Sequence, residues 1–344
     1  MHLKKVLIRR LGLVSDQFFF LDSHMLSRSR PAVEKLAVYS DTEMFSYVTP
    51  FNGNEIINCY PERYIYGLDE SIVDPLSGFI YDSSGIFIAE SSAWYILRNF
   101  YSWPKPFIRK PKKVLPGQYI FLHDIGYYHW LIEELPAFLS SYKKYPDSII
   151  LVNNDPSPWQ KCFLDSLKDV KIKYIKSPVC LERLIMTGKT AGQGNPLFGV
   201  TPNPSDIAVL RDYFKNYIYN IPSSRCKLFL SRSGESRCPK NIAEVERFME
   251  SKGYQVVNTN LNLSIFEQME LFSSAEKIIG IHGAALSNIA WCLSDVEIIE
   301  LATEGYLPPC FTMIASIRSL NYSWYSYGNT PTDMIEISKL EPFV

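Results

Sequence analysis

Short apolar runs alternate with amphipathic segments throughout the last third of the chain. The apolar runs have the length and composition of buried strands and lie at residues 227–230, 254–257, 278–281 and 296–299. The segments between them predict helices at residues 241–251, 264–274 and 284–292. A further helix is expected at 311–317 and a strand at 322–326. Strands that alternate with helices build βαβ units and a parallel sheet.

The same alternation begins after residue 117. It predicts strands at 118–122, 148–152 and 172–175, and helices at 127–142 and 157–167. Pro136 falls inside the first of these helices and should kink or locally unwind it. A helix from a Ser205 cap to about residue 219 is expected next. The chain therefore carries two α/β units.

Residues 187–204 separate the two units and are rich in Gly, Pro, Thr and Asn, as in a linker or mobile loop. We expect an N-terminal α/β domain over 1–190, a linker over 191–204 and a C-terminal domain over 205–344, whose last residues can pack back on the first domain. The first 60 residues show little periodicity, although 4–10 could be a strand. A helix is expected at 93–101.

Composition narrows the class of protein. The 344 residues are 47% hydrophobic and 21% charged, which gives enough apolar residues for the hydrophobic cores of two domains. The formal net charge of −1 argues against a nucleic-acid partner bound by bulk charge. No apolar run reaches transmembrane length, and Arg9 and Arg10 interrupt the start of the chain, so no signal peptide is expected. Seven cysteines without a CxxC pair indicate a reduced, cytoplasmic chain.

A small-residue turn follows the apolar run at 278–281. Gly283 lets a ligand approach the backbone, and the helix that starts after it offers unpaired N–H groups to an anion such as phosphate. His282 stands at the carboxyl end of the predicted strand, where open α/β sheets bind ligands. The alternative interpretation is a tight strand-to-helix turn with a packed histidine.

Four stretches in order resemble the motifs of glycosyltransferase family 61: YYHWLIEELPAF, LFLSRSGESRCPKN with AEV, LSIFEQMELFSSAEKIIGIHGAALSN, and IIEL. The resemblance covers roughly 127–301 and is strongest from Lys227 onward. It implies a GT-B-like α/β fold, in which two Rossmann-like domains face each other across a cleft. It also implies an inverting enzyme with a nucleotide-sugar donor, most simply a UDP-sugar, and no cofactor. The N-terminal domain would then bind the acceptor and the C-terminal domain the donor.

Carried onto this sequence, the family motifs assign donor binding to one group of residues: Arg232, Arg237, Gln268, His282, Gly283, Ala284 and Glu300. Glu300, at a strand end, could hold ribose hydroxyls. Glu267 and Asn288 are further candidates. Glu267 can instead form a capping box with Ser264, and Asn288 can serve packing or capping.

An inverting transfer needs a base that takes the proton of the acceptor hydroxyl. Glu133 and His129 are four residues apart and share a helical face. Either could be the catalytic base, with the other one orienting it, and the alternative is a structural ion pair. Glu134 points away from His129. The chain has no DxD motif, so no metal is expected and basic groups must stabilise the leaving diphosphate.

These features predict a transferase that acts on a surface-polysaccharide acceptor (capsule, O-antigen or lipopolysaccharide), a glycan or lipid-linked oligosaccharide. It would be cytoplasmic, with possible peripheral contact to the inner face of the membrane through the basic stretch 105–113, which could equally be a solvated connector. A non-catalytic nucleotide-sugar-binding or scaffold protein of the same fold is the alternative. The chain departs from the family at Cys238 and Pro239, where basic or apolar residues are usual, so fewer basic residues follow Arg232 to hold a phosphate. It also departs at 293–295, in a turn. No oligomeric state is predicted.

Overall fold

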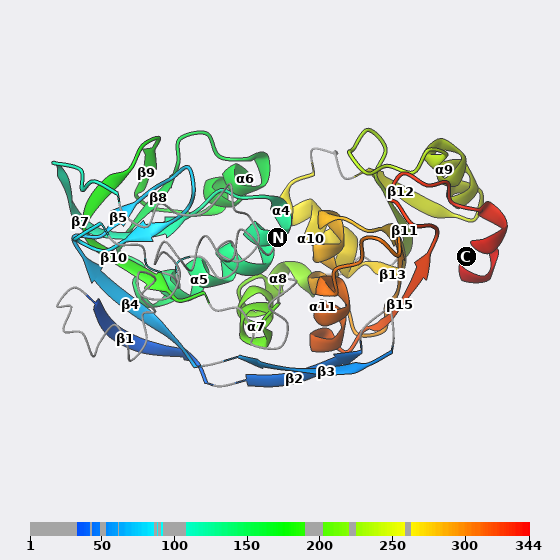
Figure 1. The fold of residues 1–344 in the computed structure, drawn as a ribbon, viewed down its shortest axis with the longest axis horizontal. Helices are drawn as coiled ribbons and strands as arrows, with labels where there is room; N and C mark the ends of the chain where they lie inside the picture. Colours follow the sequence, from blue (N-terminus) through cyan, green and yellow to red (C-terminus); the bar gives the residue numbers. More distant parts are fainter. Residues whose placement is uncertain are drawn as a thin grey trace, which may run out of the picture.

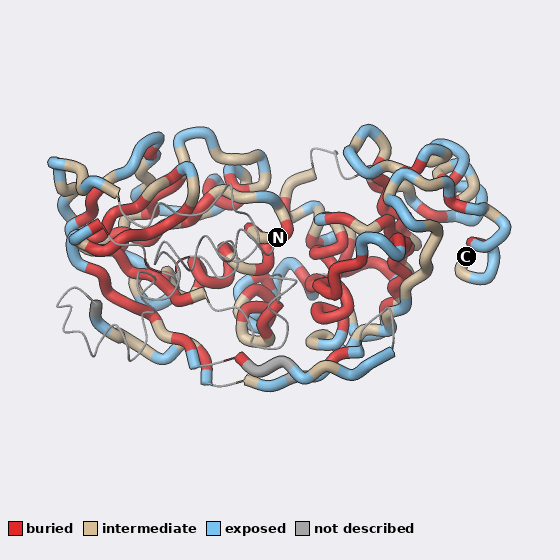
Figure 2. The backbone as a smooth tube through the Cα atoms, viewed as in Figure 1, coloured by how far each residue is buried: buried red, intermediate tan, exposed pale blue. Residues whose placement is uncertain are grey.

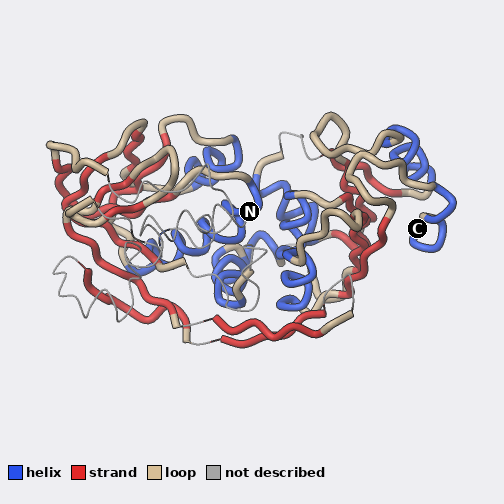
Figure 3. Tube along the Cα trace, viewed as in Figure 1, coloured by secondary structure: helices blue, strands red, loops and turns tan. Residues whose placement is uncertain are grey.

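The structure is a computed structural model of the 344-residue chain. It describes residues 33–41, 43–48, 53–60, 62–85, 88, 91, 108–189, 202–219, 225–258 and 263–344. The expected strand at 4–10, the helix at 93–101 and most of the linker lie outside these ranges. The described residues form two parallel-rich sheets with most of the helices between them (Figure 1, Figure 3). The mixed α/β class is confirmed, and the two sheets are consistent with two Rossmann-like domains.

The second sheet contains the predicted C-terminal strands. They are β11 (Cys226–Ser231), β12 (Tyr254–Asn258), β13 (Ala275–Ile281), β14 (Glu297–Ala302) and β15 (Asn321–Ser326). All neighbours are parallel in the order β12-β11-β13-β14-β15. Counted along the chain this order is 2-1-3-4-5, a doubly wound sheet whose strand order reverses between β11 and β13. Ligands bind such sheets beyond the carboxyl ends of the strands at this point.

The helices of this half are α9 (Ile242–Ser251), α10 (Ile265–Ser273) and α11 (Cys310–Arg318). The helix predicted after His282 is instead a 3-10 helix, η3 (Ala284–Trp291). Most of η3 is buried, so it packs on several sides rather than on one amphipathic face. Asn241 stands at the N-cap position of α9, but its side chain makes no capping hydrogen bond. Its side chain bonds the backbone N–H and C=O of Ile335, at 2.9 and 2.8 Å, and so holds the C-terminal segment.

The chain's last residues lie on the outer side of this second sheet. Ile335 and Leu340 are buried against Val245 and Met249 of α9, and Lys252 pairs with Glu341 at 2.8 Å. The C-terminus accordingly lies beside α9 in Figure 1. The described C-terminal residues thus pack on their own half of the molecule.

The first sheet joins six strands in the order β1-β4-β10-β7-β8-β9. Their bounds are β1 Val33–Ser40, β4 Arg63–Asp69, β7 Val114–Leu122, β8 Ile149–Asn153, β9 Ile172–Ile175 and β10 Val179–Thr187, and the short β5 (Ile72–Val73) and β6 (Ile80–Tyr81) extend it. Strands β10, β7, β8 and β9 are parallel to one another. At the edge, β4 pairs antiparallel with both β10 and β1. Sequence patterning missed β10 because Glu182 and Arg183 interrupt its apolar residues.

The helix expected at 127–142 is divided as Pro136 predicts. It consists of α4 (Tyr127–His129), a π-helical turn η2 (Trp130–Glu134) and α5 (Leu135–Lys144). Proline lacks an N–H and its ring would clash with the carbonyl four residues earlier, and a wider turn relieves that clash. The helix expected at 157–167 is confirmed as α6 (Pro158–Ser166).

One buried core cluster contains residues of both sheets, such as Ile120 of β7 and Ile278 of β13. Buried residues therefore run from one sheet through the central helices to the other (Figure 2). Helix α7 (Pro204–Tyr213) belongs to this centre. Its cap is Asn203, whose side chain accepts from the Ser205 N–H at 2.9 Å, rather than Ser205 itself. The helix ends at Tyr213 and is followed by α8 (Lys215–Ile218), so the expected single helix to 219 is wrong.

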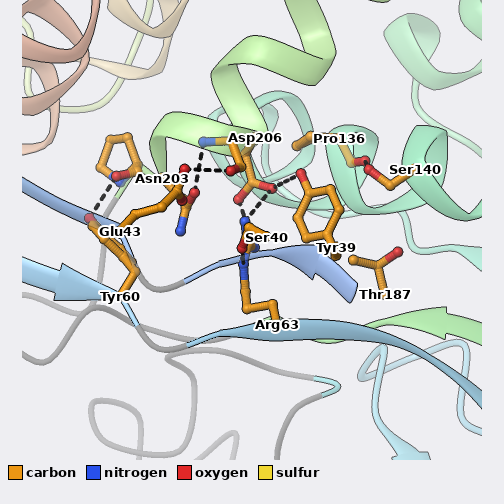
Figure 4. Close-up of polar contacts among 12 residues, drawn as sticks. Tyr39, Ser40, Glu43, Tyr60, Arg63, Pro136, Ser140, Thr187, Asn203 and Asp206 are labelled. Atoms are coloured by element: carbon orange, nitrogen blue, oxygen red, sulfur yellow. Dashed lines mark hydrogen bonds and ion pairs between the residues drawn. The ribbon is translucent and has the colours of Figure 1, made fainter. Parts of the chain in front are cut away.

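Helix α7 is attached to both halves of the molecule. At its start the Asp206 carboxylate accepts two hydrogen bonds from the Arg63 guanidinium, at 3.1 and 3.0 Å, and one from the Tyr39 hydroxyl at 2.6 Å (Figure 4). Near its end, Arg211 donates to the carbonyls of Ala290 and Cys292, at 2.8 and 3.2 Å. The first contacts lie on β1 and β4 and the second on η3, so α7 links the two sheets.

A hairpin of β2 (Glu43–Val48) and β3 (Glu55–Tyr60) extends along the same side toward α11 (Figure 1). The Tyr60 hydroxyl donates to the Pro202 carbonyl at 2.7 Å, just before α7. The hairpin comes from the N-terminal part of the chain, yet β2 packs on α11 of the other half. The domain limits 1–190 and 205–344 therefore remain a prediction.

Candidate active site

A cavity of about 530 Å³ opens at the carboxyl ends of β11 and β12. The second sheet and its helices provide most of the wall, including Arg232 after β11, Asn258 at the end of β12 and Phe272 on α10. Residues from the other half close the cavity: Tyr127, Pro158 and Trp159. The cavity thus lies at the reversal point of the second sheet and between the two halves, where an α/β protein of this topology binds a ligand.

Arg232 and Arg237 give the cavity its charge. Arg232 is only 5% exposed, and its guanidinium donates to the Ser236 carbonyl at 2.8 Å and to the His282 carbonyl at 3.4 Å. Its Nε is buried and has no hydrogen-bond partner among the described residues. Among the described lining residues the opposing charge is Glu235, 3.8 Å from the Arg232 guanidinium. Two guanidinium groups against one carboxylate favour an anionic ligand.

Burial lowers the pKa of Arg232, and the neighbouring positive charge of Arg237 lowers it further. Arg237 lies with its guanidinium 4.9 Å from the ring centre of Tyr306, as in a cation–π contact. An anion in the cavity would raise the pKa of Arg232 again, because a nearby negative charge favours the charged guanidinium.

Gly283 is required by the close approach of Arg232. A Cβ atom at this position would lie 2.0 Å from Nη1 of Arg232, closer than any real contact. The glycine therefore lets the guanidinium lie flat against the turn that opens η3. The predicted residues Arg232, Arg237, Ala284 and Gln268 all line the cavity, and Gly283 lies directly behind it.

His282 is held by a carboxylate within the protein. Its Nδ1 is bonded to Glu300, which is fully buried, and the second oxygen of Glu300 accepts a hydrogen bond from the Tyr322 hydroxyl. Burial and then the charge of Glu300 raise the pKa of Tyr322 well above its usual value, so Tyr322 keeps its proton and donates. Each Glu300 oxygen thus has a partner within the protein, and the side chain has no exposed surface. His282 itself lines a smaller hollow next to the main cavity, beside Arg237 and Tyr306.

The predicted base pair lies on the other half. His129 Nδ1 is 3.1 Å from Oε2 of Glu133, and the two side chains are 18% and 15% exposed. Glu134 points elsewhere, as expected, and forms an ion pair with Lys189.

Aromatic rings connect the two histidine–carboxylate pairs. The ring of Tyr128 is 5.2 Å from His129 and 5.9 Å from Phe311, and the ring of Phe311 is 5.2 Å from His282. Burial raises the pKa of the Cys310 thiol well above its usual value, with contributions from the charges of Glu300 and Glu133. The two pairs, far apart in sequence, are therefore neighbours in space on either side of Tyr128 and Phe311.

Asn288 joins the walls of the cavity. Its side-chain oxygen accepts from the Tyr127 hydroxyl at 2.7 Å and from the Trp291 indole at 3.1 Å, and its amide donates to Gln268 at 2.9 Å. Asn288 is 1% exposed, so its polar atoms bond mainly to other residues of the protein. Glu267 forms the capping box with Ser264, at 2.7 and 3.2 Å, as the alternative interpretation predicted.

Sequence reasoning did not find four aromatic residues of this region: Tyr127, Trp159, Tyr306 and Tyr322. Tyr127 and Trp159 each stand in the first turn of a helix that follows a strand, which is a detectable signal for the ligand edge of a sheet. Tyr306 and Tyr322 carry no local pattern, because their partners His282 and Glu300 lie 22 or more residues away in sequence.

No group of three or more His, Cys, Asp or Glu side chains in the described ranges could hold a metal ion. Across the same part of the chain, no helix combines the length and apolar character needed to cross a membrane.

Comparison with known proteins completes the description. Among solved structures, a flavo di-iron protein mutant from Thermotoga maritima shares 12% identity over 88% of this chain and 98% of its own, but its TM-score of 0.23 carries no structural argument. No curated protein sequence matches significantly. The family model described as Glycosyltransferase 61 matches residues 127–299, half of the chain. The match includes His129, Glu133 and His282 and ends one residue before Glu300. The chain therefore belongs to the glycosyltransferase 61 family and is a glycosyltransferase.

Proposed function

We propose that the protein transfers a sugar, with inversion, from a nucleotide-sugar donor to a hydroxyl of a surface-polysaccharide acceptor. The observation that carries this proposal is the buried Arg232 guanidinium, whose Nε lacks a partner among the described residues, beside Arg237 in a cavity at the reversal point of the second sheet. A nucleoside diphosphate supplies the negative charge and the acceptor oxygens that this arrangement lacks.

Donor binding follows from the same wall. The diphosphate lies against Arg232 and Arg237, and the backbone after Gly283 contributes its free N–H groups. Because a carboxylate only accepts hydrogen bonds, Glu300 fixes the proton of His282 on Nδ1 and leaves Nε2 for the substrate side. We propose that Glu300 orients His282. Positive groups here stabilise the leaving diphosphate, so the reaction needs no obligatory metal.

The acceptor side carries the base. Glu133 or His129 takes the proton from the acceptor hydroxyl, and the oxygen attacks the anomeric carbon from the face opposite the diphosphate. The new glycosidic C–O bond forms while the bond to the diphosphate breaks, and the nucleoside diphosphate leaves with the electron pair. The 3.1 Å contact between the two side chains supports both assignments: Glu133 as the base oriented by His129, or His129 as the base oriented by Glu133.

The acceptor is proposed to be a glycan or lipid-linked oligosaccharide of the capsule, O-antigen or lipopolysaccharide type, handled at the cytoplasmic face of a membrane. Exposed Lys112 and Lys113 support a peripheral contact with anionic headgroups, whereas Lys110 is paired with Glu70. The surface-polysaccharide assignment rests on the family resemblance of the motifs.

A thermal-shift screen tests the donor assignment. UDP, GDP, CMP and their sugars are each added with and without EDTA. We expect one nucleotide class, UDP most simply, to raise the Tm and to do so equally in EDTA. A shift that disappears with EDTA would contradict metal independence. No shift with any nucleotide would favour a non-catalytic role.

A further inference from the structure

The first half of the molecule contributes an aromatic wall to the cavity. The ring of Trp159 meets that of Tyr127 edge-on at 5.5 Å, and Tyr127 stacks on Trp130 at 6.4 Å. Trp159 lies in the first turn of α6, and Pro158 beside it also lines the cavity. These contacts fix the orientation of the Trp159 ring against the cavity.

The indole N–H of Trp159 is buried and has no hydrogen-bond partner among the described residues. The hydroxyl of Tyr127, by contrast, is already bonded to Asn288 at 2.7 Å. A buried donor without a partner is unfavourable, and buried tryptophan N–H groups usually find one. Because Trp159 lines the cavity, a ligand in the cavity can supply the missing acceptor.

The part of the ligand that meets Trp159 follows from the distribution of chemistry around the cavity. Both guanidinium groups lie on the second-sheet side and attract the diphosphate. Apolar side chains on that same side, Val257, Leu263 and Phe272, suit the nucleoside. The opposite wall belongs to the half that carries His129 and Glu133. A sugar in transfer must lie between diphosphate and base, and therefore against this opposite wall.

We propose that the Trp159 indole N–H donates a hydrogen bond to a hydroxyl of the transferred sugar, so that Trp159 forms the sugar subsite and helps to select the donor. The inference rests on the proposed nucleotide-sugar donor and names a residue that contacts the sugar of this donor. Tryptophan suits the task, since its apolar ring can pack on the sugar while its N–H bonds a hydroxyl.

The experiment compares affinities for a nucleotide and for its sugar. Calorimetry with the full chain measures UDP, UDP-glucose and UDP-N-acetylglucosamine, or GDP and GDP-mannose where the wild type prefers guanosine. The variant is Trp159→Phe. The control is Tyr254→Phe, which removes another buried polar hydrogen without a partner among the described residues, at the start of β12 and outside the cavity. A second variant carries benzothienylalanine at position 159, where sulfur replaces only the N–H.

We expect Trp159→Phe and the benzothienyl variant to weaken nucleotide-sugar binding about tenfold, as for one lost hydrogen bond to a buried donor. Affinity for the free nucleotide should not change, and Tyr254→Phe should leave the ratio of the two affinities unaltered. A deoxy-sugar donor that lacks the contacted hydroxyl should bind the wild type and the variants equally.

Equal weakening of nucleotide and nucleotide sugar would overturn the inference, because Trp159 would then contact the nucleotide. Unchanged affinity for both ligands would overturn it as well. A wild type that binds no nucleotide at all would instead remove the proposed function, and the sugar subsite with it, so the two failures are distinguishable.

Discussion

The imidazole of His282 is bonded through Nδ1 to Glu300, a carboxylate with no exposed surface. The two residues belong to adjacent strands: His282 directly follows β13, and Glu300 lies within β14, where it pairs with Gly280. Tyr322, from the next strand, donates to the second oxygen of Glu300. Three neighbouring strands thus fix one ring, which matters because a ring held in one orientation offers Nε2 in a fixed direction.

Glu300→Gln should therefore weaken donor binding as His282→Ala does. Loss of a hydrogen bond to a charged group costs about 1.5–3 kcal/mol, or roughly 10- to 100-fold in affinity. Calorimetry with UDP measures this loss, and the double variant should bind no more weakly than His282→Ala alone. Glu297→Gln is the matched control, since Glu297 lies at the opposite end of β14 and is 44% exposed. Unchanged UDP affinity in Glu300→Gln would show that the pair is only structural.

Glu133→Gln should leave donor affinity intact and lower turnover. A general base contributes about 10²- to 10⁴-fold, so a loss of that size in kcat is expected if Glu133 is the base. If His129 is the base, His129→Gln should show the larger loss and Glu133→Gln the smaller one. Turnover assays with UDP-binding calorimetry separate chemistry from binding.

Glu134→Gln serves as the control for this pair. It changes the adjacent carboxylate, which pairs with Lys189 on the far side of the helix. We expect it to lower the free energy of unfolding without a selective loss of kcat. Normal turnover in both Glu133→Gln and His129→Gln would move the base elsewhere in the protein.

The contact between Asp206 and Arg63 should support the whole fold, because the two side chains are 8% and 3% exposed. Asp206→Asn leaves the Arg63 charge buried without a carboxylate, which should cost about 3–5 kcal/mol of unfolding free energy. Replacing both residues, as in Asp206→Leu with Arg63→Met, should cost less than the single change. Urea unfolding of the wild type, the single variant and the double variant measures this difference.

Asp212→Asn is the matched control on the same helix. Asp212 forms exposed ion pairs with Lys143 and Lys215, at 3.3 and 3.4 Å, and solvent screens such pairs. It should have little or no effect on stability. A comparable loss in Asp206→Asn and Asp212→Asn would contradict the importance of burial.

Local sequence patterns were sufficient for the features that depend on neighbouring residues. The capping box of Ser264 and Glu267 spans three positions, and Pro136 disturbs only the turn before it. The alternation of apolar runs likewise predicted all five strands of the second sheet. The turn at Gly283 could be located from residue type, because a close approach to backbone requires glycine there.

Contacts over long sequence distances were not predictable in this way. Arg63 and Asp206 are separated by 143 positions, and Tyr127 and Asn288 by 161. Neither pair follows from periodicity, because each depends on how the two sheets meet. The contacts of Glu300 could not be predicted for the same reason, because its partners are His282, after β13, and Tyr322 of β15. The ribose contact suggested by its place in the sequence stays a prediction.

The His123 side chain should make the protein less stable in mild acid. It is 6% exposed after the end of β7, and its ring lies so close to Gly78 that a Cβ there would be 2.2 Å from Nδ1. Burial, followed by the positive charge of Lys189, lowers the pKa of His123 to about 3. The unfolded chain has a histidine pKa of about 6.5. Below that pH the unfolded chain takes up a proton that the folded chain refuses, so stability falls as the pH falls, down to about pH 3.

His123→Gln should remove this part of the pH dependence, because glutamine does not titrate. The slope for one such group is about 1.36 kcal/mol per pH unit, which amounts to about 2 kcal/mol between pH 6.5 and pH 5. Urea unfolding of the wild type and the variant at both pH values gives the difference directly, since every other titrating group is common to the two proteins. A variant that loses as much stability as the wild type over this interval would show that His123 is protonated in the folded state, and that another group causes the acid sensitivity.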